Sequence, residues 1–176
     1  MTVNQSNPLD SVTTTPDAET QQYVFNHTMF RVKDIHKSLD FYTKALGFTL
    51  IEHHDFNDAK FSLYFLGLIA DKSVIPADPA ERHLWRKSVT GLLELTHNHG
   101  TENDPEFSYH SGNSDPRGFG HLCLSVPDIH AACERFERLG VTFQKRLTDG
   151  NMKDIAFVKD PDGYWVEIIQ QTPVKK

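Results

Sequence analysis

The chain has 176 residues, a formal net charge of −6 at neutral pH and a hydrophobic content of 38%. This length suits one compact domain, or two small halves that share a core. The acidic charge argues against nucleic acid as a partner, because nonspecific binding to nucleic acid needs a basic surface. The sequence contains no apolar run of the roughly 18 to 20 residues that span a bilayer and no secretory signal, so we expect a cytoplasmic protein without membrane contact.

The first 22 residues are predicted to form a flexible tail. They are rich in Ser, Thr, Asn, Gln and Asp and poor in large apolar side chains, so burial cannot offset the entropy lost on ordering. The remaining boundaries that we expect are a first module over 23–100, a connecting loop over 101–118, a second module over 119–171 and a short tail over 172–176.

An internal repeat organises the rest of the chain. The segment from His27 to His36 matches the segment from His121 to His130 at a shift of 94 residues, with His, Val, Asp, Ile and His in common. In each copy a run of alternating residues leads into an aspartate suited to cap the helix that follows. Two copies of one strand–helix module are therefore predicted.

Apolar residues at helical spacing predict helices over 35–46 and 129–139, each followed by a glycine suited to the left-handed C-terminal position. Short β-like runs come after each helix, at 48–52, 60–66, 92–96, 142–145, 155–159 and 164–169. The sequence thus predicts an α+β fold of two βαβββ modules. Proline-containing insertions are expected to be loops, with at most a short helix near 80–87.

Two histidines and two glutamates stand at equivalent positions of the repeat. Alternation along the strands places His27 and His121 on the face that points away from the apolar core. Glu94 and Glu167 lie between apolar neighbours in the last strand of each copy, so their carboxylates also point away from the core. A pseudo-twofold axis would gather these four side chains into a set of N/O ligands that suits zinc, nickel, cobalt or iron.

Simpler interpretations exist for single residues of this kind. A lone strand histidine more often makes a structural hydrogen bond, and a lone strand glutamate is more often solvated. The coincidence at four repeat-equivalent positions favours a metal site. His97 would face opposite to Glu94 in a strand. The other histidines are interpreted as exposed residues or local hydrogen-bonding groups: His36, His53, His54, His83, His99, His110 and His130.

Six segments, in order along the chain, resemble the glyoxalase I (lactoylglutathione lyase) family of the vicinal-oxygen-chelate superfamily. They are HTMFRVKD at 27–34, SLDFY at 38–42, KFSLYFL at 60–66, LELTHN at 93–98, NSDPRGFGH at 113–121 and DPDGYWVEI at 160–168. The resemblance covers about residues 23–170. The fold that it implies is the paired βαβββ arrangement that the repeat already predicts, in the form of a dimer.

The resemblance implies that all four residues are metal ligands. It also implies that the sites form between subunits, with His27 and Glu94 of one chain meeting His121 and Glu167 of the other. The metal that it implies is Zn²⁺, with Ni²⁺ or Co²⁺ as the alternative. It also implies glutathione as the co-substrate and a reaction that converts the hemithioacetal of methylglyoxal and glutathione to S-lactoylglutathione and so detoxifies methylglyoxal.

The resemblance further implies particular substrate contacts. The residues expected to bind glutathione or to cover the substrate are Arg31, Asn98, Arg117, Lys145 and Met152. Arg146 is an alternative to Lys145. The apolar pocket for the aldehyde side of the substrate is expected to comprise Phe56, Phe61, Leu63 and Phe65.

In this reaction a proton moves from C1 to C2 through an enediolate, and we assign Glu167 as the main base and returning acid. Glu94 is a ligand and the possible base for the other hemithioacetal epimer. Three rival functions share the fold: an iron extradiol dioxygenase with two His and one Glu, a bleomycin-resistance-type binding protein, and a metal-dependent glutathione transferase of the fosfomycin-resistance type. The set of two His and two Glu argues against the first two of these, and the segments at 113–121 and 160–165 fit the lyase better than the third.

Overall fold

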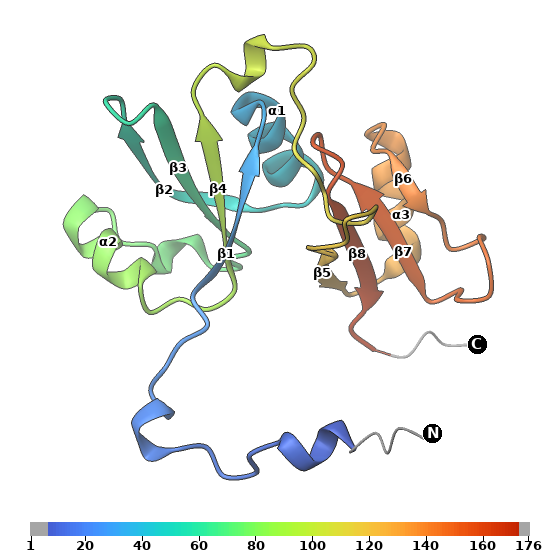
Figure 1. Ribbon diagram of the computed structural model, residues 1–176, viewed down its shortest axis with the longest axis horizontal. Helices are drawn as coiled ribbons and strands as arrows, with labels where there is room; N and C mark the ends of the chain where they lie inside the picture. The colour runs from blue at the N-terminus through green and yellow to red at the C-terminus, as the bar shows by residue number, and fades with distance from the viewer. Residues whose placement is uncertain (1–6, 173–176) are drawn as a thin grey trace, which may run out of the picture.

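A computed structural model describes residues 7–172, which form two four-stranded mixed sheets, each built from one copy of the repeat (Figure 1). The first sheet has the order β1-β4-β3-β2 and the second the order β5-β8-β7-β6, so the two copies share one topology. The strands are β1 (His27–Val32), β2 (Thr49–Phe56), β3 (Phe61–Gly67), β4 (Leu92–Asn98), β5 (His121–Val126), β6 (Phe143–Lys145), β7 (Ile155–Lys159) and β8 (Trp165–Gln170). The predicted α+β fold of two βαβββ modules is confirmed.

The first and last strands of each module are paired in the same register. β1 runs parallel to β4 with Met29 opposite Glu94, and β5 runs parallel to β8 with Cys123 opposite Glu167. Each histidine lies two residues before that position and therefore on the same face of its sheet. The repeat in the sequence is thus reproduced at the level of individual strand pairs.

The helix after each first strand begins at the predicted aspartate. Asp34 caps α1 (Ile35–Asp40) and Asp128 caps α3 (Ile129–Arg138), each through its side-chain oxygen. The first helix does not continue as a regular α-helix to residue 46 as predicted, because its last turn, Phe41–Ala45, is a π-helical turn. The hydroxyl of Thr43 donates to the carbonyl of Leu39 there, which competes with the regular helical hydrogen bonds.

One apolar core serves both modules. It contains Val32 and Leu95 from the first sheet and Val166 and Ile168 from the second, all of them fully buried. The rings of Phe30 and Tyr164 meet across the two modules with centroids 4.6 Å apart. The chain is therefore a single packed unit rather than two separate domains.

A buried hydrogen bond also joins the modules. The hydroxyl of Tyr42, in the π-helical turn, donates to Asp160 Oδ2 at 3.0 Å, and Asp160 Oδ1 accepts from the backbone N–H groups of Asp162 and Tyr164. Burial, together with the nearby charge of Asp162, raises the pKa of Asp160 to about 7. The Asp-Pro-Asp-Gly turn therefore anchors the second module to the first.

Some boundaries differ from those predicted. β2 continues to Phe56 instead of ending at residue 52, and β4 continues to Asn98. The polar residues after position 52 concealed this extension, which is fixed by pairing with β3. The expected short helix in the first insertion is α2 (Pro79–Arg86), capped by Asp78, and a 3-10 turn, Thr101–Asn103, lies in the expected connecting loop.

The chain before β1 lies away from the two sheets in Figure 1. Within 7–22 it contains two short 3-10 turns, Pro8–Ser11 and Ala18–Thr20, and every residue is exposed. The predicted tail therefore packs against nothing in the chain where it is described, and its first six residues lie outside the described range. No helix in 7–172 is long and apolar enough to cross a membrane.

Candidate metal centre

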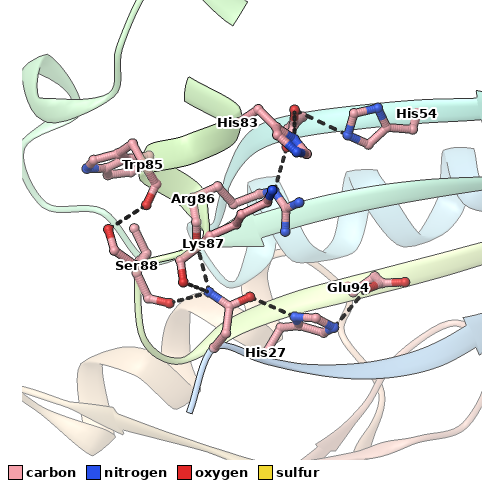
Figure 2. A network of polar contacts seen from close by, with 11 residues as sticks. His27, His54, His83, Trp85, Arg86, Lys87, Ser88 and Glu94 are labelled. Carbon is pink, nitrogen blue, oxygen red and sulfur yellow. Dashed lines mark hydrogen bonds and ion pairs between the residues drawn. The ribbon is translucent and has the colours of Figure 1, made fainter. Parts of the chain in front are cut away.

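His27 and Glu94 meet on the open face of the first sheet (Figure 2). His27 Nε2 lies 2.9 Å from Glu94 Oε2, and the two residues come from the neighbouring strands β1 and β4. The carboxylate is largely buried, and the hydroxyl of Thr96 contacts its other oxygen at 3.4 Å. The ring of His27 packs edge-on against Phe65, with centroids 5.7 Å apart.

Asn26 determines which nitrogen of His27 carries a proton. Its amide nitrogen donates to the backbone carbonyls of Arg86 and Val89 at 2.8 and 2.7 Å, so its Oδ1 must be the atom that faces His27 Nδ1 at 2.8 Å. Because Oδ1 can only accept, Nδ1 donates, and the lone pair of a neutral ring is then on Nε2. That lone pair faces the carboxylate of Glu94, so the contact requires a cation, either a proton or a metal ion.

The second sheet carries the equivalent pair. His121 Nε2 lies 3.3 Å from Glu167 Oε2, and both side chains are partly exposed. Cys123 stands beside Glu167 in the register of β5 and β8 and is a free cysteine whose thiol is partly covered. Burial and a hydrogen bond to Glu167 raise the pKa of this thiol to about 11, so it is uncharged at neutral pH.

The four predicted ligands therefore form two separate pairs within one chain. Within residues 7–172, the single group of three or more side chains spaced to hold a metal is Glu52, His54 and His83, and it contains none of the four. His97, as expected, points to the other face of β4, where its Nε2 lies 2.8 Å from Glu102.

The residues predicted to bind glutathione lie in different parts of the chain. Arg31 and Asn98 lie on the face that carries His27 and Glu94, as strand alternation requires. Arg31 lines a small cavity of about 260 Å³ together with Met29 and Tyr109. Arg117 is highly exposed and is 3.5 Å from Asp115.

Lys145 is not a free surface charge. Its amino group donates to the backbone carbonyls of Met152 and Ile155 at 2.6 and 2.7 Å, and thus holds the loop between β6 and β7 closed on itself. Met152, predicted to cover the substrate, lies in this loop with 55% of its surface exposed. Lys145 and Met152 are therefore joined by a hydrogen bond, which the sequence did not predict.

The four residues of the predicted apolar pocket share one face of the first sheet. Phe56 lies opposite Phe61, and their rings stack with centroids 4.7 Å apart. Phe65 lies directly beside Glu94 in the register of β3 and β4, with Leu63 two residues before it on the same face. The structure thus places this apolar strip next to the first His/Glu pair.

A polar cluster that was not predicted from the sequence lies at the end of that strip. Glu52 and His54 of β2 face His83 and Arg86 of α2, and Figure 2 shows His54, His83 and Arg86 close together. Arg86 makes an ion pair with Glu52, and its Cζ lies 3.6 Å from the centroid of the Phe65 ring. Burial alone would raise the pKa of Glu52, but hydrogen bonds from Arg86 and His83 outweigh burial and lower it. The spacing of two between Glu52 and His54 could have shown that they share a face of one strand. The predicted strand ended at residue 52 and so did not include His54.

Comparisons with known proteins agree with this architecture. The family model of the Glyoxalase/Bleomycin resistance protein/Dioxygenase superfamily matches residues 24–168. A lactoylglutathione lyase of Pseudomonas putida is 65% identical over 99% of this chain and 100% of its own length, and one of Pseudomonas aeruginosa is 57% identical over 88% and 86%. The structure of the trypanothione-dependent glyoxalase I of Leishmania major is 29% identical, covers 85% of this chain and 87% of its own, and superimposes with a TM-score of 0.62.

Proposed function

The chain belongs to the Glyoxalase/Bleomycin resistance protein/Dioxygenase superfamily and, within it, to the lactoylglutathione lyases, and we propose that it carries out their reaction at a metal held by its two His/Glu pairs. The reaction converts the hemithioacetal of methylglyoxal and glutathione to S-lactoylglutathione. The rival functions of dioxygenase and antibiotic-binding protein are disfavoured by these relatives. The observation that carries the proposal is the repeat-equivalent placement of the two pairs.

The geometry of each pair fits a metal ion. Ligands bound at about 2.1 Å lie about 3.0 to 3.4 Å apart around one ion. The N···O distance of the second pair, 3.3 Å, falls within this range, and that of the first pair, 2.9 Å, lies just below it. The orientation of Asn26 supplies a further argument, because it leaves His27 Nε2 as an acceptor in front of a carboxylate. Two imidazoles and two carboxylates suit Zn²⁺, with Ni²⁺ or Co²⁺ as the alternative.

We place the complete site between two subunits. Each chain carries both pairs on separate sheets, with both histidine side chains partly exposed. A twofold dimer would set the first pair of one subunit against the second pair of the other and so create two equivalent sites. Exposed apolar side chains on the same face, among them Met29 and Phe56, support a covered surface there.

The proposed chemistry is a proton transfer between adjacent carbons. Glu167 takes the proton from C1 of the hemithioacetal and returns it to C2, while the hydroxyl proton moves from the C1 oxygen to the C2 oxygen. The bound metal supplies stabilisation of the oxygen charge that develops in the transition state. Glu94, on the opposite side, serves the other epimer. This scheme creates a thioester and a new alcohol without any net redox change.

Glutathione would bind along the same open face. Arg31, four residues after His27 on one face of β1, can offer its planar guanidinium to a glutathione carboxylate. Asn98 can hydrogen-bond a peptide group at the end of β4. The loop held by Lys145 brings Met152 to the rim as a cover.

The proposal is tested by removing and restoring the metal. The stripped protein is incubated with methylglyoxal and glutathione, zinc, nickel or cobalt is added back separately, and thioester formation is followed by its ultraviolet absorbance. We expect no turnover without metal and recovery with at least one of these ions. The absence of thioester with every ion would contradict the proposal.

A further inference from the structure

We propose that Glu52, His54 and His83 form a second site for a divalent transition metal, separate from the two His/Glu pairs. The three ligand atoms lie within 4.8 Å of one another. His83 Nδ1 is 3.1 Å and His54 Nε2 is 3.2 Å from the same oxygen, Glu52 Oε1. These distances match the roughly 3.0 to 3.4 Å that separates neighbouring ligands around one ion.

The local structure preorganises these three side chains. Glu52 and His54 are two residues apart on β2 and so share a face of the strand, while α2 brings His83 over them. The carboxylate of Glu52 is largely buried, whereas the histidine side chains are 36% and 40% exposed. An ion can therefore enter from solvent and meet a fixed carboxylate.

Arg86 orients the carboxylate of Glu52 and also lowers the affinity of the proposed second site for a metal ion. Its guanidinium pairs with Glu52 Oε2, which leaves Oε1 free to face the two imidazoles. Such an outer contact holds a ligand in place. Because the guanidinium adds a positive charge near the ion, we expect weaker binding here than at the proposed catalytic site. Two imidazole nitrogens favour zinc, copper or nickel over magnesium or calcium.

The proposed second site lies on the same face of the first sheet as the first His/Glu pair. Glu52 lies beside Phe65, and Phe65 lies beside Glu94, in one row across three strands. Strands about 4.8 Å apart put the second site about 10 Å from the first pair. The ring of Phe65 contacts both His27 and His54 edge-on. A metal here would tie α2 to β2 beside the apolar strip.

The test counts bound zinc with the holoprotein. Wild-type protein, H54N/H83N and H53N are dialysed against excess Zn²⁺, and zinc per chain is measured by atomic emission. His53 is the matched control because it lies on the same strand, points to the opposite face and stacks on Tyr64. We expect H54N/H83N to bind one zinc ion per chain fewer than wild type, and H53N to match wild type.

Equal zinc content in wild type and H54N/H83N would overturn the proposal, as would the same loss in H53N. A single variant, H83Q, removes one exposed ligand from α2 and should weaken zinc at this site by at least about tenfold. An H121N/E167Q variant separates the two proposals, because it should lose the tighter zinc and keep the weaker one. If H121N/E167Q instead keeps the tighter zinc, the proposed catalytic site fails while the second site stands.

Discussion

Among single residues, Glu167 is the proposed proton carrier. Replacing Glu167 with Gln keeps an oxygen that can bind metal but removes the base. We expect turnover to fall by about 10² to 10⁴-fold or more, with the variant still folded. Steady-state kinetics and circular dichroism measure the two effects. Near-normal turnover in a folded E167Q protein would refute the assignment of Glu167.

Asn26 offers a second expectation at this scale. Its Oδ1 faces His27 Nδ1, which leaves Nε2 as the atom that would bind the proposed metal. The N26A variant should bind the catalytic metal about 10- to 100-fold more weakly. A matched control is S88A, which removes a hydrogen bond to Trp85 in the adjacent turn without touching His27. Competition titration with a chelating dye measures the affinity, and unchanged binding in N26A would show that its hydrogen bond to His27 does not tune the site.

Among the secondary-structure elements, α2 docks on the first sheet partly through a buried ion pair. Arg86 and Glu52 are both largely buried in side chain, and removing one charge leaves the other uncompensated. We expect R86L to lose about 3 to 5 kcal/mol of stability, and E52Q/R86L to lose less than the sum of the single changes. Urea unfolding of wild type, R86L, E52Q and E52Q/R86L measures the coupling energy between the two side chains. Additive losses of stability would mean that the ion pair does not stabilise the docking of α2.

The elements also show what the sequence could and could not predict. The faces of β1, β4, β5 and β8 followed from period-two alternation, because each strand has one buried and one open side. Asp34 and Asp128 marked the helix starts through their capping chemistry. The π-helical turn and the extension of β2 were missed, because both depend on hydrogen bonds that local composition does not reveal.

The candidate site was predictable to a similar degree. The two His/Glu pairs stood out because the repeat placed them at equivalent strand positions. The cluster of Glu52, His54 and His83 did not, since it joins a strand to a helix in an insertion that has no counterpart in the second copy. The hydrogen bonds from Lys145 to the loop between β6 and β7 were not predicted either, because the partners of a long flexible side chain are set by tertiary contacts and not by local sequence pattern.

For the molecule as a whole, Asp160 makes the folding stability depend on pH. Its folded pKa of about 7 lies above the ordinary value of 3.8, so its contribution to stability is complete below about pH 4 and is lost as pH rises through about 7. Relative to D160N, the wild type should therefore lose up to about 4 kcal/mol of stability between those pH values. Urea unfolding of both proteins across this range tests the sign; a constant difference would contradict it.

Each proposed active site takes one His/Glu pair from each of two subunits. Co-expression of H27N/E94Q chains with H121N/E167Q chains tests it directly, since each variant alone should be inactive. Random pairing makes half of the dimers mixed, and each mixed dimer has one intact site, so we predict about a quarter of wild-type activity. No recovery of activity in isolated mixed dimers would contradict a site shared between subunits.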